Sequence, residues 1–172
     1  MVVIRRRTWL RLGVVSTVVL TAAGAGVVLT TPPGFAQGNL SAGAGEACKA
    51  IARAVLDGRL PADKARLEAA LDAHLERLED VIGGFPTAVQ AEISELLTLL
   101  STAAGRVGLM GVMLPWSSAS VGSIQAGLAS MRRSSISLRL QAYHALRDLT
   151  HAAWYADEAQ WSELGYPGPT PL

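Results

Sequence analysis

Apolar residues recur at steps of three and four along much of the chain, and this spacing constrains the fold more than any other feature of the sequence. The clearest example lies between Pro61-Ala62-Asp63 and Gly83-Gly84, two groups that open and end a helix. Its apolar positions are Leu67, Leu71, Leu75, Leu78 and Ile82. Because residues at this spacing share one face of an α-helix, we predict an amphipathic helix packed on a core.

Similar patterns predict the other helices and no strand. A short helix is expected at residues 46–56, another begins at Pro86-Thr87 with Thr87 as its N-cap, and a long one spans about 134–156 before a short turn at 157–164. Three glycines at 105–111 should bend or break the chain, while residues 113–130 have poor helical propensity. The fold class is therefore all-α, a small bundle of four or five helices after an N-terminal signal segment.

The start of the chain resembles a twin-arginine export signal. The segment Arg6-Arg7-Thr8-Trp9-Leu10-Arg11 follows the pattern of two arginines, any residue, an aromatic residue, a leucine and a basic residue. The positions that define this signal are Arg6, Arg7, Trp9 and Leu10. The apolar run that follows, Leu12 to Leu29, is diluted by glycine, serine and threonine, so it is less apolar than a stable membrane span.

The leader is expected to end at Ala36. Pro32-Pro33-Gly34 breaks any helix, and Gly34-Phe35-Ala36 places small residues at both positions that a signal peptidase reads before a cut after Ala36. We therefore predict a signal peptide at 1–36, a flexible linker rich in glycine and alanine at 37–45, and a helical domain at 46–172. The protein is then expected in the periplasm. The alternative is an uncleaved leader that anchors the bundle in the inner membrane.

Charge and cysteine content exclude several classes of function. Without the leader, eleven basic residues face fourteen acidic ones, a net charge of −3, and the one basic doublet is Arg132-Arg133. A nucleic-acid-binding protein would carry a basic stripe on its folded part, so we expect no nucleic-acid partner. Cys48 is the single cysteine, which excludes an internal disulfide and any cysteine-based metal or haem motif, and leaves a semi-buried thiol or an intermolecular pair.

No catalytic, metal or cofactor constellation stands out. The histidines are His74, His144 and His151, and the last two share a helix face, but a metal site would need further ligands from a neighbouring helix. His144 and Asp148 form an i, i+4 pair, yet no motif supplies a strained nucleophile with an oxyanion hole. Glycine-rich phosphate loops are missing as well. We expect no enzyme activity, no metal and no cofactor on this chain itself.

The C-terminus concentrates the aromatic residues. Four of the nine aromatic side chains fall within thirteen residues. The last of them, Tyr166, belongs to the segment Gly165-Tyr166-Pro167-Gly168-Pro169. Such residues either cover the end of a small bundle or anchor a partner surface, because Trp and Tyr bury a large area at low entropic cost. The residues predicted to bind a partner are Trp154, Tyr155, Trp161, Gly165, Tyr166 and Pro167.

The segment from Arg132 to Pro169 resembles the gluconate 2-dehydrogenase subunit 3 family. The residues that carry the resemblance are Ala142-Tyr143, Ala145-Leu146, Ala153-Trp154-Tyr155, Trp161 and Leu164-Gly165-Tyr166-Pro167-Gly168-Pro169, together with the leader. Members of this family are small subunits of flavin-dependent sugar and alcohol dehydrogenases, with a twin-arginine leader and a helical body. The middle of the chain matches only in general character.

The resemblance implies a division of labour among subunits. A large subunit of the glucose-methanol-choline oxidoreductase type carries FAD and transfers hydride, and a haem c subunit is a further partner for onward electron transfer. The small subunit is non-catalytic: it helps the large subunit mature and lets both cross the membrane through the twin-arginine translocase. The rival hypothesis is a stand-alone periplasmic helical protein that binds a small ligand or metal.

Overall fold

The computed structural model describes residues 31–167, except for the side chains of residues 162–164. The chain divides at Pro32–Pro33, and the fold described below is that of the second unit. The predicted export-signal residues Arg6, Arg7, Trp9 and Leu10 lie outside the described residues. The all-α prediction is confirmed, with six α-helices in the described part where the sequence predicted four or five. None of these helices has both the length and the apolar character of a membrane span.

Two short strands precede the first described helix. Strand β1 (Phe35–Ala36) pairs antiparallel with β2 (Asn39–Leu40), and Phe35 faces Leu40 in the register. Gln37 and Gly38 make the turn with φ of 52° and 83°, the left-handed conformation that two-residue hairpins need. This hairpin differs from the flexible linker predicted at 37–45. The sequence signal was weak because each strand has only two residues.

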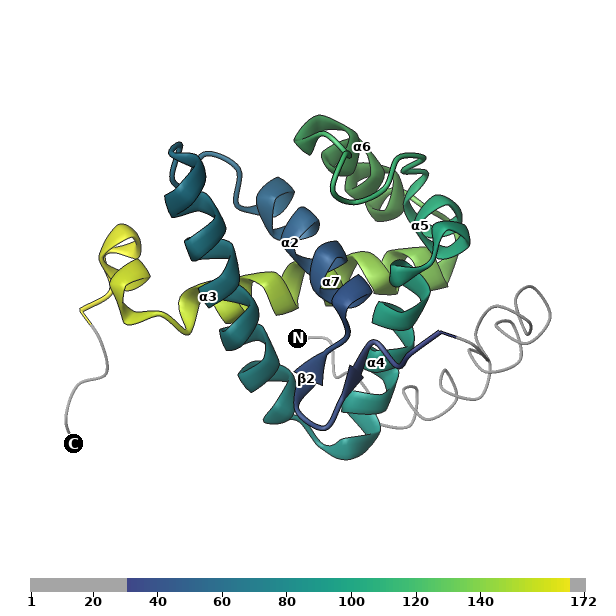
Figure 1. Cartoon of the computed structure of the whole chain (residues 1–172), viewed down its shortest axis with the longest axis horizontal. Helices are drawn as coiled ribbons and strands as arrows, with labels where there is room; N and C mark the ends of the chain where they lie inside the picture. The colour runs from purple at the N-terminus through teal and green to yellow at the C-terminus, as the bar shows by residue number, and fades with distance from the viewer. Residues whose placement is uncertain (1–30, 168–172) are drawn as a thin grey trace, which may run out of the picture. The chain divides into compact units, whose positions relative to one another are not determined.

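Helix α2 (Ala42–Val55) forms the centre of the bundle. It starts four residues earlier than predicted, because the Ser41 hydroxyl caps it by accepting a hydrogen bond from the amide of Ala44. Helices α3, α4, α6 and α7 all contact it (Figure 1). Its buried positions are mostly small: Ala44, Gly45, Ala47, Cys48, Ala50, Ile51, Ala52 and Ala54. Small side chains allow the surrounding helices to approach closely.

Helices α3 (Lys64–Gly83) and α4 (Thr87–Ser101) follow the predicted periodicity closely. On α3 the Asp63 carboxylate caps the N-terminus, and the predicted stripe is buried or half-buried. On α4 the predicted N-cap is wrong: Pro86 occupies the cap position, and Thr87 is the first helical residue. Pro86 makes no side-chain cap, and its carbonyl oxygen accepts the hydrogen bonds of the Val89 and Gln90 amides at the start of the helix.

The glycine-rich centre of the chain is ordered into two helices, α5 (Ala103–Met110) and α6 (Val121–Arg132). The break comes at Thr102, whose hydroxyl caps α5, while Gly111 ends α5 with a φ of 72°. The loop between them is held by Trp116, whose Nε1–H donates to the carbonyl oxygen of Leu100 at 2.9 Å. These tertiary contacts explain why propensity alone assigned no structure to 113–130.

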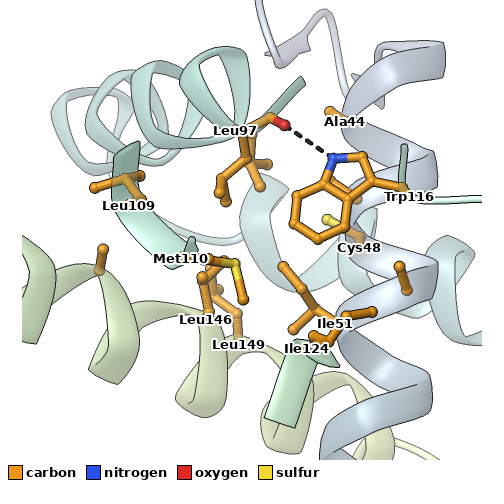
Figure 2. Close-up of a cluster of buried hydrophobic side chains, with 14 of the residues drawn as sticks. Ala44, Cys48, Ile51, Leu97, Leu109, Met110, Trp116, Ile124, Leu146 and Leu149 are labelled. Atoms are coloured by element: carbon orange, nitrogen blue, oxygen red, sulfur yellow. Dashed lines mark hydrogen bonds between the residues drawn. The ribbon is translucent and has the colours of Figure 1, made fainter. Parts of the chain in front are cut away.

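Helix α7 (Ser137–Tyr155) crosses behind α2 and α3 and leads into the 3₁₀ helix η1 (Glu158–Leu164) (Figure 1). The main core gathers side chains from all six α-helices and from the α5–α6 loop, and Figure 2 shows part of it. Its labelled members are Ala44, Cys48, Ile51, Leu97, Leu109, Met110, Trp116, Ile124, Leu146 and Leu149. A second, smaller cluster joins α2, α3 and α7 through Ala52, Leu56, Leu71 and Trp154.

The closeness of α6 to the end of α5 gives a stability prediction. A Cβ on Gly127 would lie 2.7 Å from the carbonyl oxygen of Met110, so backbone would have to shift, whereas Gly122 on the same helix has open space around it. We expect Gly127→Ala to lower the free energy of unfolding by about 1–3 kcal/mol. Gly122→Ala should leave it unchanged or raise it slightly, because alanine favours the helix. Equal results for the two variants in denaturant melts would contradict this packing.

Candidate partner-binding site at the C-terminus

The predicted partner-binding residues separate into a buried group and an exposed group. Trp154 is 4% exposed and packs in the second cluster with Leu56 and Leu71, so its ring holds α7 against α2 and α3 and offers no surface to a partner. Tyr155 is half-buried at the end of α7. Gly165, Tyr166 and Pro167 are exposed. The spacing of Trp154 from Leu146 and Leu149 favours the buried face of α7, whereas the aromatic composition of the segment grouped it with the exposed residues.

Trp161 and Tyr166 form a compact pair, here called the tail pair. The indole Nε1–H of Trp161 donates to the carbonyl oxygen of Tyr155 at 2.8 Å, which turns η1 back onto the end of α7. The two rings meet edge to face with centroids 5.4 Å apart, and the amide of Tyr166 donates to the carbonyl oxygen of Trp161 at 3.1 Å. Gly165 allows this return with a φ of 65°. The tail pair therefore has a defined shape.

Arg77 of α3 fixes the base of this tail. Its Nε donates to the carbonyl oxygen of Ala153 at 3.0 Å, and its Nη1 lies 3.5 Å from Oδ2 of Asp157. The other carboxylate oxygen of Asp157 accepts a hydrogen bond from the amide of Ala159 at 3.0 Å, at the start of η1. Sequence analysis missed Arg77. The only signal was a basic side chain on the border of the apolar stripe of α3.

The tail pair leaves one aromatic ring open to contact. Tyr166 is 50% exposed, although its ring packs against Trp161. Because the ring already packs against Trp161, little further side-chain conformational entropy would be lost on covering it. The tail therefore presents one half-exposed aromatic ring held in a fixed position.

The three histidines do not form a metal site. His74 is 1% exposed on α3, and neither ring nitrogen has a hydrogen-bond partner among the described residues. His144 is exposed and its ring meets Tyr143, while the Asp148 carboxylate accepts from Nε of Arg147 at 2.8 Å. Within residues 31–167 no three potential metal-binding side chains come together.

Cys48 lines a cavity in the core. The cavity measures about 10 Å³ and is lined by Cys48, Ile51, Leu78, Ile82, Leu97, Leu146, Leu149 and Thr150. This space holds about one water molecule, far less than a flavin or a haem needs. Burial, and secondly the nearby Glu79 carboxylate, raises the pKa of the Cys48 thiol to about 12, which keeps it protonated and unreactive.

Comparison with known proteins gives no relative for this arrangement. No family model, no curated protein and no solved structure matches the chain.

The buried His74 predicts a pH-dependent stability. Burial, and secondly the charge of Arg77, lowers the pKa of His74 to about 4, while in the unfolded chain it is near 6.5. Between these values only the unfolded state takes up the proton, so stability is full above about pH 6.5 and falls as the pH is lowered toward 4. The loss should approach about 3 kcal/mol across this window.

Denaturant melts between pH 7 and pH 4.5 would measure this loss. His74→Leu should remove most of the decline in that window, because the buried group that resists protonation is gone. His144→Gln, at an exposed position, should keep the decline. An unchanged pH profile in the His74 variant would show that another group controls it.

Proposed function

We propose that this protein is the non-catalytic small subunit and export escort of a periplasmic FAD-dependent sugar or alcohol dehydrogenase of the glucose-methanol-choline type. It binds the large subunit through its C-terminal tail, aids its maturation and carries it through the twin-arginine translocase. The observation that carries the proposal is the tail pair, an exposed aromatic surface with a defined shape on a chain whose sequence resembles that family in this same segment.

The export route supports the same division of labour. Twin-arginine export moves proteins that have already folded, commonly because a cofactor was inserted beforehand. The core cavity beside Cys48 measures about 10 Å³, too small for a bulky redox group, and in the proposed complex that group belongs to the partner. A signal on the small subunit then serves the flavoprotein bound to it.

The tail pair has the chemistry expected of an interface anchor. Trp and Tyr dominate the binding energy of protein interfaces when they sit in a well-packed patch. Here the ring of Trp161 packs edge to face against the ring of Tyr166. Pro167 is also exposed, and it has no amide hydrogen that a partner would have to satisfy. FAD resides on the large subunit, and a haem c subunit accepts electrons from it. The small subunit supplies position and surface.

Loss of the Tyr166 ring from the tail pair should weaken binding of the partner more than it weakens folding. We expect Tyr166→Ala to reduce the affinity for the flavoprotein by about 10-fold or more, the effect of losing an interface anchor. Its melting temperature should change little, because the ring is half-exposed. The measurement is a pull-down with the tagged protein, followed by flavin absorbance of the eluate.

Phe85→Ala is the matched control, since Phe85 is a 38% exposed aromatic residue on the α3–α4 connection, away from the tail in sequence. This variant should capture the flavoprotein normally. The proposal is wrong if the tagged wild-type protein emerges alone, or with a bound ligand or metal of its own in place of a flavoprotein.

The leader can be tested separately. Replacing Arg6 and Arg7 together by lysine should leave both this protein and its flavoprotein partner in the cytoplasm, because the translocase reads the arginine pair. Cell fractionation with immunoblotting measures the distribution. Undiminished export of the double variant would assign the chain to another pathway.

A further inference from the structure

The residues that join the leader to the domain are built into the bundle. Both backbone polar groups of Phe35 form hydrogen bonds with the Ser94 side chain. The Phe35 amide donates to Oγ of Ser94 at 3.0 Å, and the Ser94 hydroxyl donates to the Phe35 carbonyl oxygen at 2.8 Å. The Phe35 ring is 6% exposed and belongs to the main core. A leader residue removed by a cut after Ala36 would contribute none of these contacts to the mature domain.

Gly34, which precedes Phe35, and Leu40, which pairs with Phe35 across the hairpin, also form hydrogen bonds. The amide of Gly34 donates to Oγ1 of Thr98 at 2.7 Å, and the Gly34 carbonyl oxygen accepts from the amide of Ser41 at 3.0 Å. On the other strand of the hairpin, the amide of Leu40 donates to Oε1 of Glu79 at 2.7 Å. The hairpin therefore bridges α3 and α4.

Gly34 lies directly against the backbone of α4. A Cβ at this position would lie 2.5 Å from Cβ of Leu97 and 2.5 Å from the amide nitrogen of Thr98. The glycine is thus needed for close packing inside the folded domain. Close packing therefore explains why position 34 is a glycine, without the peptidase recognition that the sequence pattern suggested.

These contacts conflict with a cut after Ala36. A peptidase binds the residues before its cleavage site as an extended, accessible strand, but Gly34 and Phe35 are buried against α4. The Ala36–Gln37 bond itself enters a turn in which Gln37 has a φ of 52°, so it is not extended either. A protein exported in its folded state would keep the Ala36–Gln37 bond in this turn, beside buried residues, where a peptidase could not bind it as an extended strand.

We propose that the segment Pro33–Leu40 is a permanent part of the folded domain, and that leader processing takes place upstream of Gly34. This inference rests on the proposed export leader for its processing step, whereas the role of the hairpin in the fold stands on its own contacts. Upstream, Ala23-Gly24-Ala25 supplies alanines at both positions that a signal peptidase reads before a cut that leaves Gly26 first.

The first test is the mass of the full chain after export. Intact-mass spectrometry and N-terminal sequencing of the protein from the periplasmic fraction should give an N-terminus upstream of Gly34, with Gly26 as the expected first residue. A mature protein that begins at Gln37 would overturn the proposal. Failure of export in the wild-type cell would instead count against the leader, and the second test does not depend on it.

The second test compares two purified proteins, one starting at Pro33 and one at Gln37. The first contains the whole described core and should fold normally. The second lacks Phe35 and its hydrogen bonds, so we expect a melting temperature lower by about 10 °C. Equal melting temperatures would overturn the proposal.

Ser94→Ala in both proteins identifies the contact responsible. In the protein that starts at Pro33, this change should lower the melting temperature, because the backbone of Phe35 loses its partner. In the protein that starts at Gln37, it should have almost no effect, because that partner is already absent. The same decrease in both proteins would show that Ser94 acts without the hairpin and would contradict the assignment.

Discussion

Close approach of four helices to α2 is the constraint on which the rest of the bundle depends. The buried face of α2 is built largely from alanine, with Ala44, Ala47 and Ala52 fully covered. Small side chains bring the helix axes together, and the larger residues of the neighbours fill the space around them at the density of a close-packed interior. A larger side chain at Ala52 would push apart the helices that form the second cluster, and one at Ala44 or Ala47 would disturb the main core. The central helix therefore determines where α3 and α7 meet, and with them the base of the tail.

Periodicity predicted the long helices, because their apolar stripes repeat over several turns. The stripe of α3 and the ends of α7 were predicted within a few residues. Tertiary contacts decide the features that the sequence did not reveal. The hairpin at Phe35 depends on Ser94 and Thr98, which are some sixty residues away in the chain. Likewise, the loop after α5 is fixed by Trp116 through a hydrogen bond to another helix.

The candidate site shows the same limit. The sequence identified the aromatic concentration at the C-terminus, and two of its four aromatic residues, Trp161 and Tyr166, form the tail pair. Composition alone grouped Trp154, which faces the core, with Tyr166, which faces outward, although the helical spacing of Trp154 from Leu146 favours the buried face. It also gave no indication that Arg77 reaches the end of α7, since a hydrogen bond to a backbone carbonyl leaves no trace in the pattern of side-chain types.

The described domain combines a closed interior with an open end. Its core cavity is too small for a bulky ligand, its cysteine is buried and protonated, and its histidines are dispersed. Its exposed large apolar side chains include Tyr166 of the tail pair, and Met113, Leu114 and Ile136 elsewhere.

The attachment of the tail to α3 has a thermodynamic consequence for association. Arg77 holds both the last turn of α7 and the first residues of η1, so the orientation of Trp161 is set before any partner arrives. A peptide of the same sequence without the bundle would have to lose its backbone and side-chain freedom during the encounter. In the intact protein that ordering has already taken place during folding, so the binding proposed above would carry a smaller entropic cost.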